Sequence, residues 1–109
     1  VRPTMYDSYH EVVAANRADA PAVREYSIAG PICETGDILA KDRMLPELHA
    51  GDIIAVLDAG AYGFAMSSQY NSRPRCAEVL LSGGKAALMR RAETIEDLTA
   101  LMATPPWQA

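Results

Sequence analysis

Two β-like runs, 77–81 and 86–91, flank the turn-forming residues Ser82, Gly83, Gly84 and Lys85. Paired glycines between two such runs predict a β-hairpin with a tight turn. Further short runs at 9–15, 22–29, 38–41 and 52–57 are separated by loops. The 109 residues therefore predict one mainly β domain, an antiparallel barrel or sandwich.

The boundaries of these runs follow from residue type. Gly30 and Pro31 end the run 22–29, because proline cannot donate a hydrogen bond to a neighbouring strand. The run 52–57 is almost continuously apolar, which predicts a strand buried on both faces. Residues 33–37 are expected to form a loop, and residues 44–50 to be irregular.

A single helix is predicted, at 94–102 near the C-terminus. Thr94 can cap it, and Asp97 stands at capping-box spacing. Leu98 and Leu101 give the helix an apolar stripe, and the two prolines after residue 104 prevent its continuation.

Charge and composition disfavour several classes of partner. The net charge is −4 and aromatic residues make up 6%, so neither a nucleic acid nor an anionic membrane is expected as a partner. The longest apolar run, 53–57, is too short to span a bilayer, and no signal peptide is visible. Two distant cysteines indicate free thiols and a cytoplasmic protein. The first residue, Val1, suggests a piece of a longer protein.

The loop 33–37 holds the densest group of reactive side chains. It carries the thiol of Cys33 beside the carboxylate of Glu34, with Asp37 closing the loop. Such a pair can be a proton donor beside a recognition group, half of a metal site, or a buried cysteine next to a solvated glutamate. His10 and His49 lack matching ligands nearby, so no metal site is predicted.

Two further places can bind a ligand. Arg2 can clamp a carboxylate through its planar guanidinium, and the Tyr6 hydroxyl can add a donor. The alternative is a solvated arginine and a packing tyrosine. Tyr62 lies between Gly60 and Gly63, on a tight turn or single helical turn that leaves its phenol accessible, although a turn tyrosine without function is also possible.

Taken in order, six motifs resemble one family, the C-terminal domain of diaminopimelate decarboxylases, which are pyridoxal-phosphate enzymes of fold type III. The motifs extend over nearly the whole chain: 2–6 (RPTMY), 30–37 (GPICETGD), 51–52 (GD), 58–63 (DAGAYG), 70–74 (YNSRP) and 78–79 (EV). Thr35 and Cys76 depart mildly from the usual pattern.

The resemblance implies a Greek-key β-barrel similar to the C-terminal domain of alanine racemase. It implies a missing N-terminal (β/α)8 barrel, which would carry the Schiff-base lysine and the phosphate-binding glycines. It also implies a head-to-tail homodimer with its active sites at the subunit boundary. Residues 1–109 alone are then expected to be inactive.

The resemblance also implies a reaction, the decarboxylation of meso-diaminopimelate to L-lysine, in which pyridoxal phosphate accepts the electrons that carbon dioxide leaves behind. Cys33 would supply a proton to the partner subunit's site, and Glu34 would pair with the distal ammonium of the substrate. Arg2 and Tyr6 would bind the distal carboxylate, and Tyr62 would touch cofactor and substrate.

Arg2 and Glu34 bear on the choice of substrate. Ornithine, arginine and lysine lack a distal carboxylate, so a buried Arg2 would face no partner in their complexes. Related ornithine-type enzymes tend to carry aspartate after the cysteine, where this chain has Glu34. Two alternatives stay open: a decarboxylase of the same fold for ornithine, arginine or a polyamine precursor, and a non-catalytic β module for dimerisation or binding.

Overall fold

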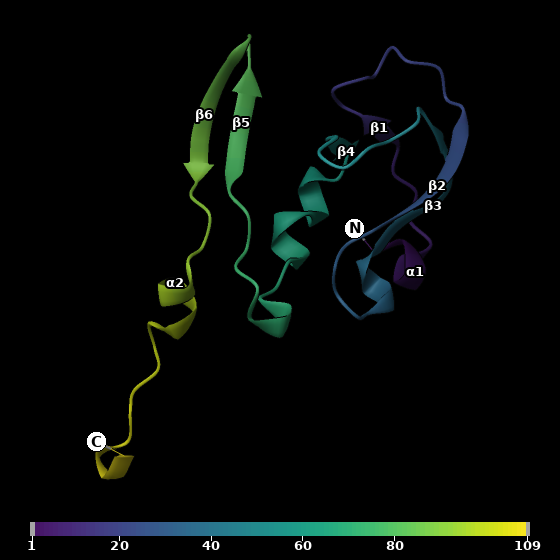
Figure 1. Ribbon diagram of the computed structural model, residues 1–109. Helices are drawn as coiled ribbons and strands as arrows, with labels where there is room; N and C mark the ends of the chain where they lie inside the picture. Colours follow the sequence, from purple (N-terminus) through teal and green to yellow (C-terminus); the bar gives the residue numbers. More distant parts are fainter. Residues whose placement is uncertain (1, 109) are drawn as a thin grey trace. The chain divides into compact units, whose positions relative to one another are not determined.

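The computed structural model describes residues 2–108, and the chain divides into two compact units, Val1–Met66 and Ser67–Ala109. Both units contain short antiparallel strands and few helical segments (Figure 1). The predicted mainly β character is confirmed. Within the described residues the strands form three two-stranded sheets and no closed barrel, so the predicted barrel is not seen.

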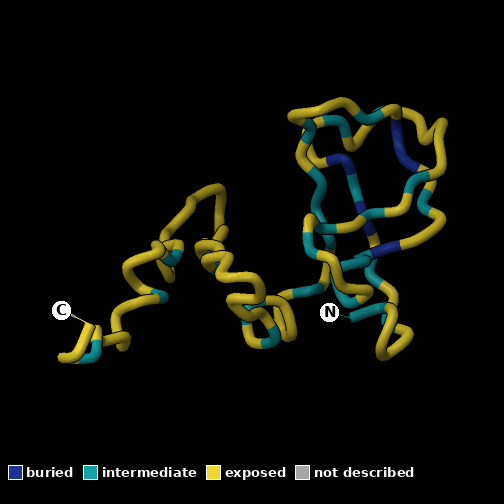
Figure 2. Tube along the Cα trace, turned by 60° about the horizontal axis from the view of Figure 1, so that its bottom comes forward, coloured by how far each residue is buried: buried dark blue, intermediate teal, exposed yellow. Residues whose placement is uncertain are grey.

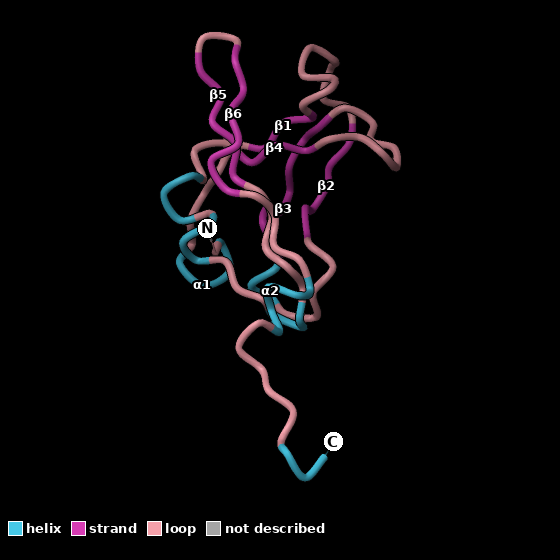
Figure 3. The backbone as a smooth tube through the Cα atoms, turned by 90° about the vertical axis from the view of Figure 1, so that its left-hand side faces the viewer, coloured by secondary structure: helices cyan, strands magenta, loops and turns pink. Residues whose placement is uncertain are grey.

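The first unit contains a four-residue helix followed by four strands. Strand β2 pairs antiparallel with β3, and β1 pairs antiparallel with β4, so the β2–β3 pair is nested inside the β1–β4 pair along the chain. The elements are α1 (Pro3–Tyr6), β1 (Val12–Ala14), β2 (Arg24–Ala29), β3 (Ile38–Leu45) and β4 (Ile54–Val56). Single 3₁₀ turns occupy the connections (Figure 3), at Thr35–Asp37, Gly60–Tyr62 and Phe64–Met66.

A small apolar core holds this unit together. Val12, Ala40 and Leu45 are buried against one another, and Tyr26 packs beside them. The Tyr26 hydroxyl accepts a hydrogen bond of 2.8 Å from the backbone N–H of Leu48, which ties the segment after β3 to β2. The buried stretches, dark blue in Figure 2, lie in this unit. The core therefore fixes β1, β2 and β3 as the frame on which the N-terminal residues rest.

Three predictions about the strands of this unit were wrong, two about their length and one about their burial. The run 9–15 is a strand only over β1, and β3 continues through Leu45 into the segment expected to be irregular. Cross-strand pairing is the reason, since Met44 and Leu45 find partners in β2. The run 52–57 is not buried on both faces: β4 is half-buried and Ile53 is 62% exposed. Among residues 2–108, β4 pairs with one strand, β1, so it is not a central strand of a larger sheet.

The second unit contains the predicted hairpin, β5 (Glu78–Ser82) and β6 (Lys85–Arg90). Gly83 and Gly84 have φ angles of 55° and 73°. A two-residue turn with both central φ angles positive matches the right-handed twist of the strands, and glycine adopts it without steric cost. The hairpin prediction is confirmed.

Helix α2 (Ile95–Thr99) is shorter than the predicted 94–102, but its start is as predicted. Thr94 accepts from the N–H of Asp97 at 3.3 Å, and the Asp97 carboxylate accepts from the N–H of Thr94 at 2.8 Å. Helix α1 was not predicted, because four residues are too few to show a helical period. No helix among residues 2–108 is both long and apolar enough to cross a membrane.

Candidate functional site

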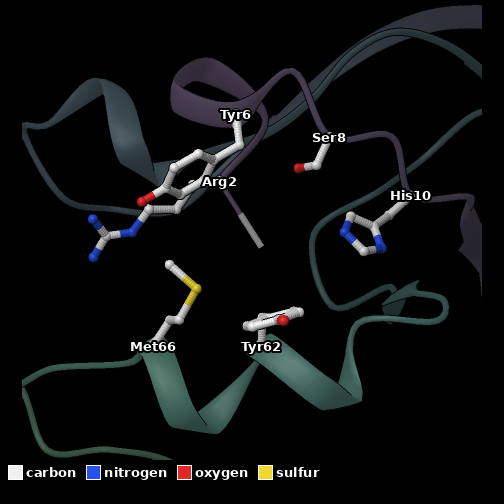
Figure 4. A pocket seen from close by; sticks show the side chains of 6 residues that line it. All are labelled: Arg2, Tyr6, Ser8, His10, Tyr62 and Met66. Atoms are coloured by element: carbon white, nitrogen blue, oxygen red, sulfur yellow. The ribbon is translucent and has the colours of Figure 1, made fainter.

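A pocket of about 380 Å³ opens in the first unit between the N-terminal segment and the turns that follow β4. Figure 4 shows side chains of the N-terminal segment on one side and side chains of two 3₁₀ turns on the other. A concave site with a few polar groups among apolar ones is the usual form of a small-molecule site. The described residues that line it are Arg2, Tyr6, Ser8, His10, Tyr62 and Met66.

Helix α1 brings Arg2 and Tyr6 to the same side. Pro3 at the first helical position favours the helix, because its missing N–H would have no partner there. Arg2 precedes the helix and Tyr6 ends it, and residues four apart on a helix are neighbours. The structure therefore unites a guanidinium and a phenol, as the clamp for a carboxylate requires.

Tyr62 ends a 3₁₀ turn and is 65% exposed, with its ring facing the N-terminal segment (Figure 4). Gly63 lets the chain turn back closely at this point. A Cβ at residue 63 would lie 2.9 Å from the carbonyl oxygen of Ala59, which is too close for any side chain. The predicted turn position of Tyr62 is confirmed, and the turn directs its phenol to the pocket.

Ser8, His10 and Met66 line the same pocket and were not proposed from the sequence as ligand-binding residues. Ser8 and His10 stand two residues apart in the segment that follows α1, and residues two apart on an extended segment share one face. That spacing was the signal that the sequence offered. The serine and the histidine were missed because neither stands in a recognised catalytic pattern.

Cys33 and Glu34 are exposed and lie outside the six lining residues. Their loop is closed by Asp37, whose carboxylate accepts from the N–H of Ile32 at 2.7 Å. The N–H of Gly30 donates to the Asp37 carbonyl at 2.8 Å. One pocket thus unites Arg2, Tyr6 and Tyr62 and does not include the thiol and carboxylate of this loop.

The loop is also attached to helix α1. The Thr4 hydroxyl donates to the carbonyl oxygen of Thr35 at 2.9 Å. Because α1 carries Tyr6, the loop of Cys33 and the pocket share one support. The two groups of candidate residues are therefore connected through α1 within the first unit.

The carboxylate with the most perturbed pKa in the first unit lies elsewhere. Hydrogen bonds from the N–H of His49 and from the Asn16 amide, together with the Arg17 guanidinium, lower the pKa of Asp52 to about 2. These residues join the loop after β1 to the loop before β4, and none lines the pocket. We interpret these four residues, the Asp52 cluster, as structural and not catalytic. A charged group that accepts several hydrogen bonds can also stabilise a fold.

The chain matches the family model described as the C-terminal sheet domain of pyridoxal-dependent decarboxylases over residues 1–60, and it belongs to this family. Among curated proteins it is 56% identical over 107 residues to the diaminopimelate decarboxylase of Archaeoglobus fulgidus. It is 51% identical over 98 residues to that of Methanothermobacter thermautotrophicus. These alignments cover 98% and 90% of this chain but 26% and 23% of those proteins, so the chain spans about a quarter of their length.

Solved structures give the same result for the fold. The chain is similar to the crystal structure of a diaminopimelate decarboxylase from M. jannaschii in complex with L-lysine, with a TM-score of 0.88 and 38% identity. A diaminopimelate decarboxylase from Helicobacter pylori, also complexed with L-lysine, gives a TM-score of 0.79 and 39% identity. The chain is covered to 99% and 91%, and each of those chains to 24%.

Proposed function

We propose that this chain is the C-terminal domain of a diaminopimelate decarboxylase, which converts meso-diaminopimelate to L-lysine and carbon dioxide. The observation that carries the proposal is that Arg2, Tyr6 and Tyr62 line the same pocket. Relatives with about half of their aligned residues identical to this chain carry the name of that enzyme.

Arg2 and Tyr6 bind the distal carboxylate of the substrate. The guanidinium offers a planar pair of donors that matches a carboxylate, and the phenol of Tyr6 adds another. Both come from one helical turn, so the clamp is assembled before the ligand arrives. A ligand without a distal carboxylate leaves the guanidinium unpaired on binding, which disfavours ornithine and lysine as substrates.

Pyridoxal phosphate supplies an electron sink for the carbon that loses carbon dioxide. The family description names this dependence. Tyr62 fits such a group: its phenol lines the pocket on a turn bracketed by glycines, where a bulky ligand can approach closely. No lysine is among the six lining residues, so we place the cofactor's covalent attachment on an N-terminal (β/α)8 barrel outside this chain.

Cys33 and Glu34 act on the site of a second copy of the protein. Both are exposed on a loop braced by Asp37, and they lie outside the pocket of Arg2. A thiol can hold a proton at neutral pH and deliver it to a carbanion, and a carboxylate can pair with the distal ammonium. The active enzyme is then a head-to-tail homodimer.

The proposal extends to the fold of the domain. Each sheet has only two strands and therefore has unpaired edges. We infer that the short strands of this chain belong to a Greek-key barrel similar to the C-terminal domain of alanine racemase.

The proton-donor role is tested in the full-length enzyme by Cys33→Ala, with Cys76→Ala as the matched control. Both cysteines are exposed, but only Cys33 stands on the braced loop. We expect the first change to slow lysine formation by about 10²- to 10⁴-fold, the usual contribution of a general acid, and the second to leave it unchanged. Equal activity of both variants would refute the role of Cys33. If the enzyme released putrescine from ornithine and no lysine from diaminopimelate, diaminopimelate would be refuted as its substrate.

Mixed dimers test the shared site. If Arg2 and Cys33 of different chains form each site, dimers of an Arg2→Ala chain and a Cys33→Ala chain contain one intact site. Random mixing of two inactive proteins then restores about a quarter of the wild-type activity, since half of the dimers are mixed and each has one intact site of two. No recovery on mixing would place both residues in a site within one chain.

A further inference from the structure

Ser8 has a side chain whose hydrogen-bonding capacity is unused. Its hydroxyl oxygen is buried and has no hydrogen-bond partner among the described residues. Figure 4 shows this oxygen directed into the space between Tyr6 and His10. A buried hydroxyl without a partner is costly, and most buried polar groups in proteins are satisfied. A ligand in the pocket can supply the missing partner.

His10 presents a second group on the same side. Its Nδ1 lies 3.1 Å from the carbonyl oxygen of Leu57. A carbonyl only accepts, so Nδ1 is the donor of this hydrogen bond, and in the tautomer with its proton on Nδ1 the lone pair is on Nε2. Since His10 lines the pocket and Nδ1 is engaged by the backbone, Nε2 is the ring nitrogen available to a ligand.

We propose that Ser8 Oγ and His10 Nε2 form the acceptor side of the pocket and bind the distal ammonium of the substrate, beside the carboxylate held by Arg2 and Tyr6. The proposal rests on the function proposed above. It adds a binding site for the distal ammonium to the site already proposed for the distal carboxylate. In diaminopimelate the distal ammonium and carboxylate share one carbon, so a pocket that binds one must also accommodate the other.

The number of donors supports this arrangement. An ammonium has three N–H donors, and a single carboxylate from Glu34 of the second copy leaves some of them without an acceptor. Ser8 and His10 supply two more acceptors, neither of which is a carboxylate. The acceptors for the ammonium therefore do not include a carboxylate of the same chain. The substrate's distal carboxylate then has no such competitor for the Arg2 guanidinium.

His10 has a positioning role that must be separated from this contact. Its bond to Leu57 fixes the start of the segment that leads to Tyr62. Asparagine places an amide N–H near the position of Nδ1 but has no counterpart of Nε2. His10→Asn therefore keeps the bond to Leu57 and removes the ligand contact, whereas His10→Ala removes both.

The experiment uses the full-length enzyme and two ligands. One is meso-diaminopimelate, and the other is 2-aminopimelate, which keeps both carboxylates and has one ammonium. The variants are Ser8→Ala and His10→Asn, with Ser27→Ala on β2 as a control outside the pocket. Dissociation constants are measured by calorimetry, and KM and kcat for diaminopimelate are measured alongside.

Ser8→Ala and His10→Asn should each weaken diaminopimelate binding by about 10- to 100-fold, the usual range for a hydrogen bond to a charged group, and 2-aminopimelate binding by about 2-fold or less. Equal losses for both ligands, or no loss, would overturn the proposal. Ser8→Ala decides the matter if the histidine variant fails to fold. A wild-type enzyme that does not release lysine would refute the proposed function, and the ratio of the two binding losses would still decide this inference.

Discussion

Replacement of Gly30 by alanine tests whether the loop of Cys33 depends on the Asp37 carboxylate. A Cβ at residue 30 would lie 2.3 Å from both carboxylate oxygens, whereas ordinary contacts begin at 3.4 Å. The carboxylate must therefore retreat by about 1.1 Å, the difference between these distances. A carboxylate that clears the new Cβ gives up the position from which it accepts the 2.7 Å hydrogen bond of the Ile32 N–H.

Two effects follow from this displacement. The lost bond leaves a half-buried amide without a partner, which costs about 1–3 kcal/mol of unfolding free energy. Cys33 follows Ile32 directly, so a loop that loses this bond holds the proton donor less well, and misplacement of a catalytic group costs on the order of 10²-fold in turnover. Urea unfolding of the full-length enzyme measures the first effect, and lysine release at saturating diaminopimelate measures the second.

Two controls make the test specific to Asp37. Gly60→Ala introduces a Cβ with no atom within 4 Å and should be tolerated. Asp37→Ala alone should resemble Gly30→Ala, and the double variant should be little worse than either, because the Cβ then meets no carboxylate. The reasoning is refuted if Gly30→Ala leaves both stability and turnover at wild-type values. It is also refuted if Gly30→Ala costs as much in the Asp37→Ala background as in the wild type.

Three further predictions concern stability. Because the pKa of Asp52 is lowered from 3.8 to about 2 in the folded chain, its ionised form stabilises the fold above pH 4, and this stabilisation is lost as the pH falls toward 2. In the Asp52→Asn variant, the free energy of unfolding measured in urea should depend less on pH over that interval. An unchanged pH dependence would contradict a stabilising role for the Asp52 cluster. Thr94→Ala should cost α2 about 1 kcal/mol, measured by amide exchange, whereas Thr94→Ser should cost little. Gly83→Val should destabilise the hairpin by about 1–2 kcal/mol because its φ is positive, and Gly83→Asn should be tolerated, as exchange of the β5 and β6 amides can show.

Features decided by neighbouring residues were predictable from the sequence. The turn at Gly83 and Gly84 and the capping box of Thr94 and Asp97 depend on a few adjacent positions, and both are confirmed. The extension of β3 to Leu45 depends on pairing with Arg24, which lies far away in the sequence. The length of a strand depends on the residues with which it pairs. The residue pattern of one segment therefore does not predict where its strand ends.

Some residues of the candidate site were predictable from the sequence, and others were not. Arg2, Tyr6 and Tyr62 were selected by motif, and the structure brings them into one pocket. Ser8 and His10 were missed because their importance depends on what they face: an unpaired hydroxyl and a ring nitrogen fixed by Leu57. Only the folded chain reveals which polar groups lack a partner.

The nesting of the strand pairs has a consequence for the order of folding. Joining residues 29 and 38 closes a short loop between β2 and β3, whereas joining residues 14 and 54 directly closes a long one. Loop-closure entropy grows with loop length, so the inner hairpin is expected to form first and to shorten the free chain that the outer pair must close. Mutations in β2 and β3 should then slow folding, while mutations in β1 and β4 should mainly speed unfolding. The strands next to the pocket residues would be the last to close.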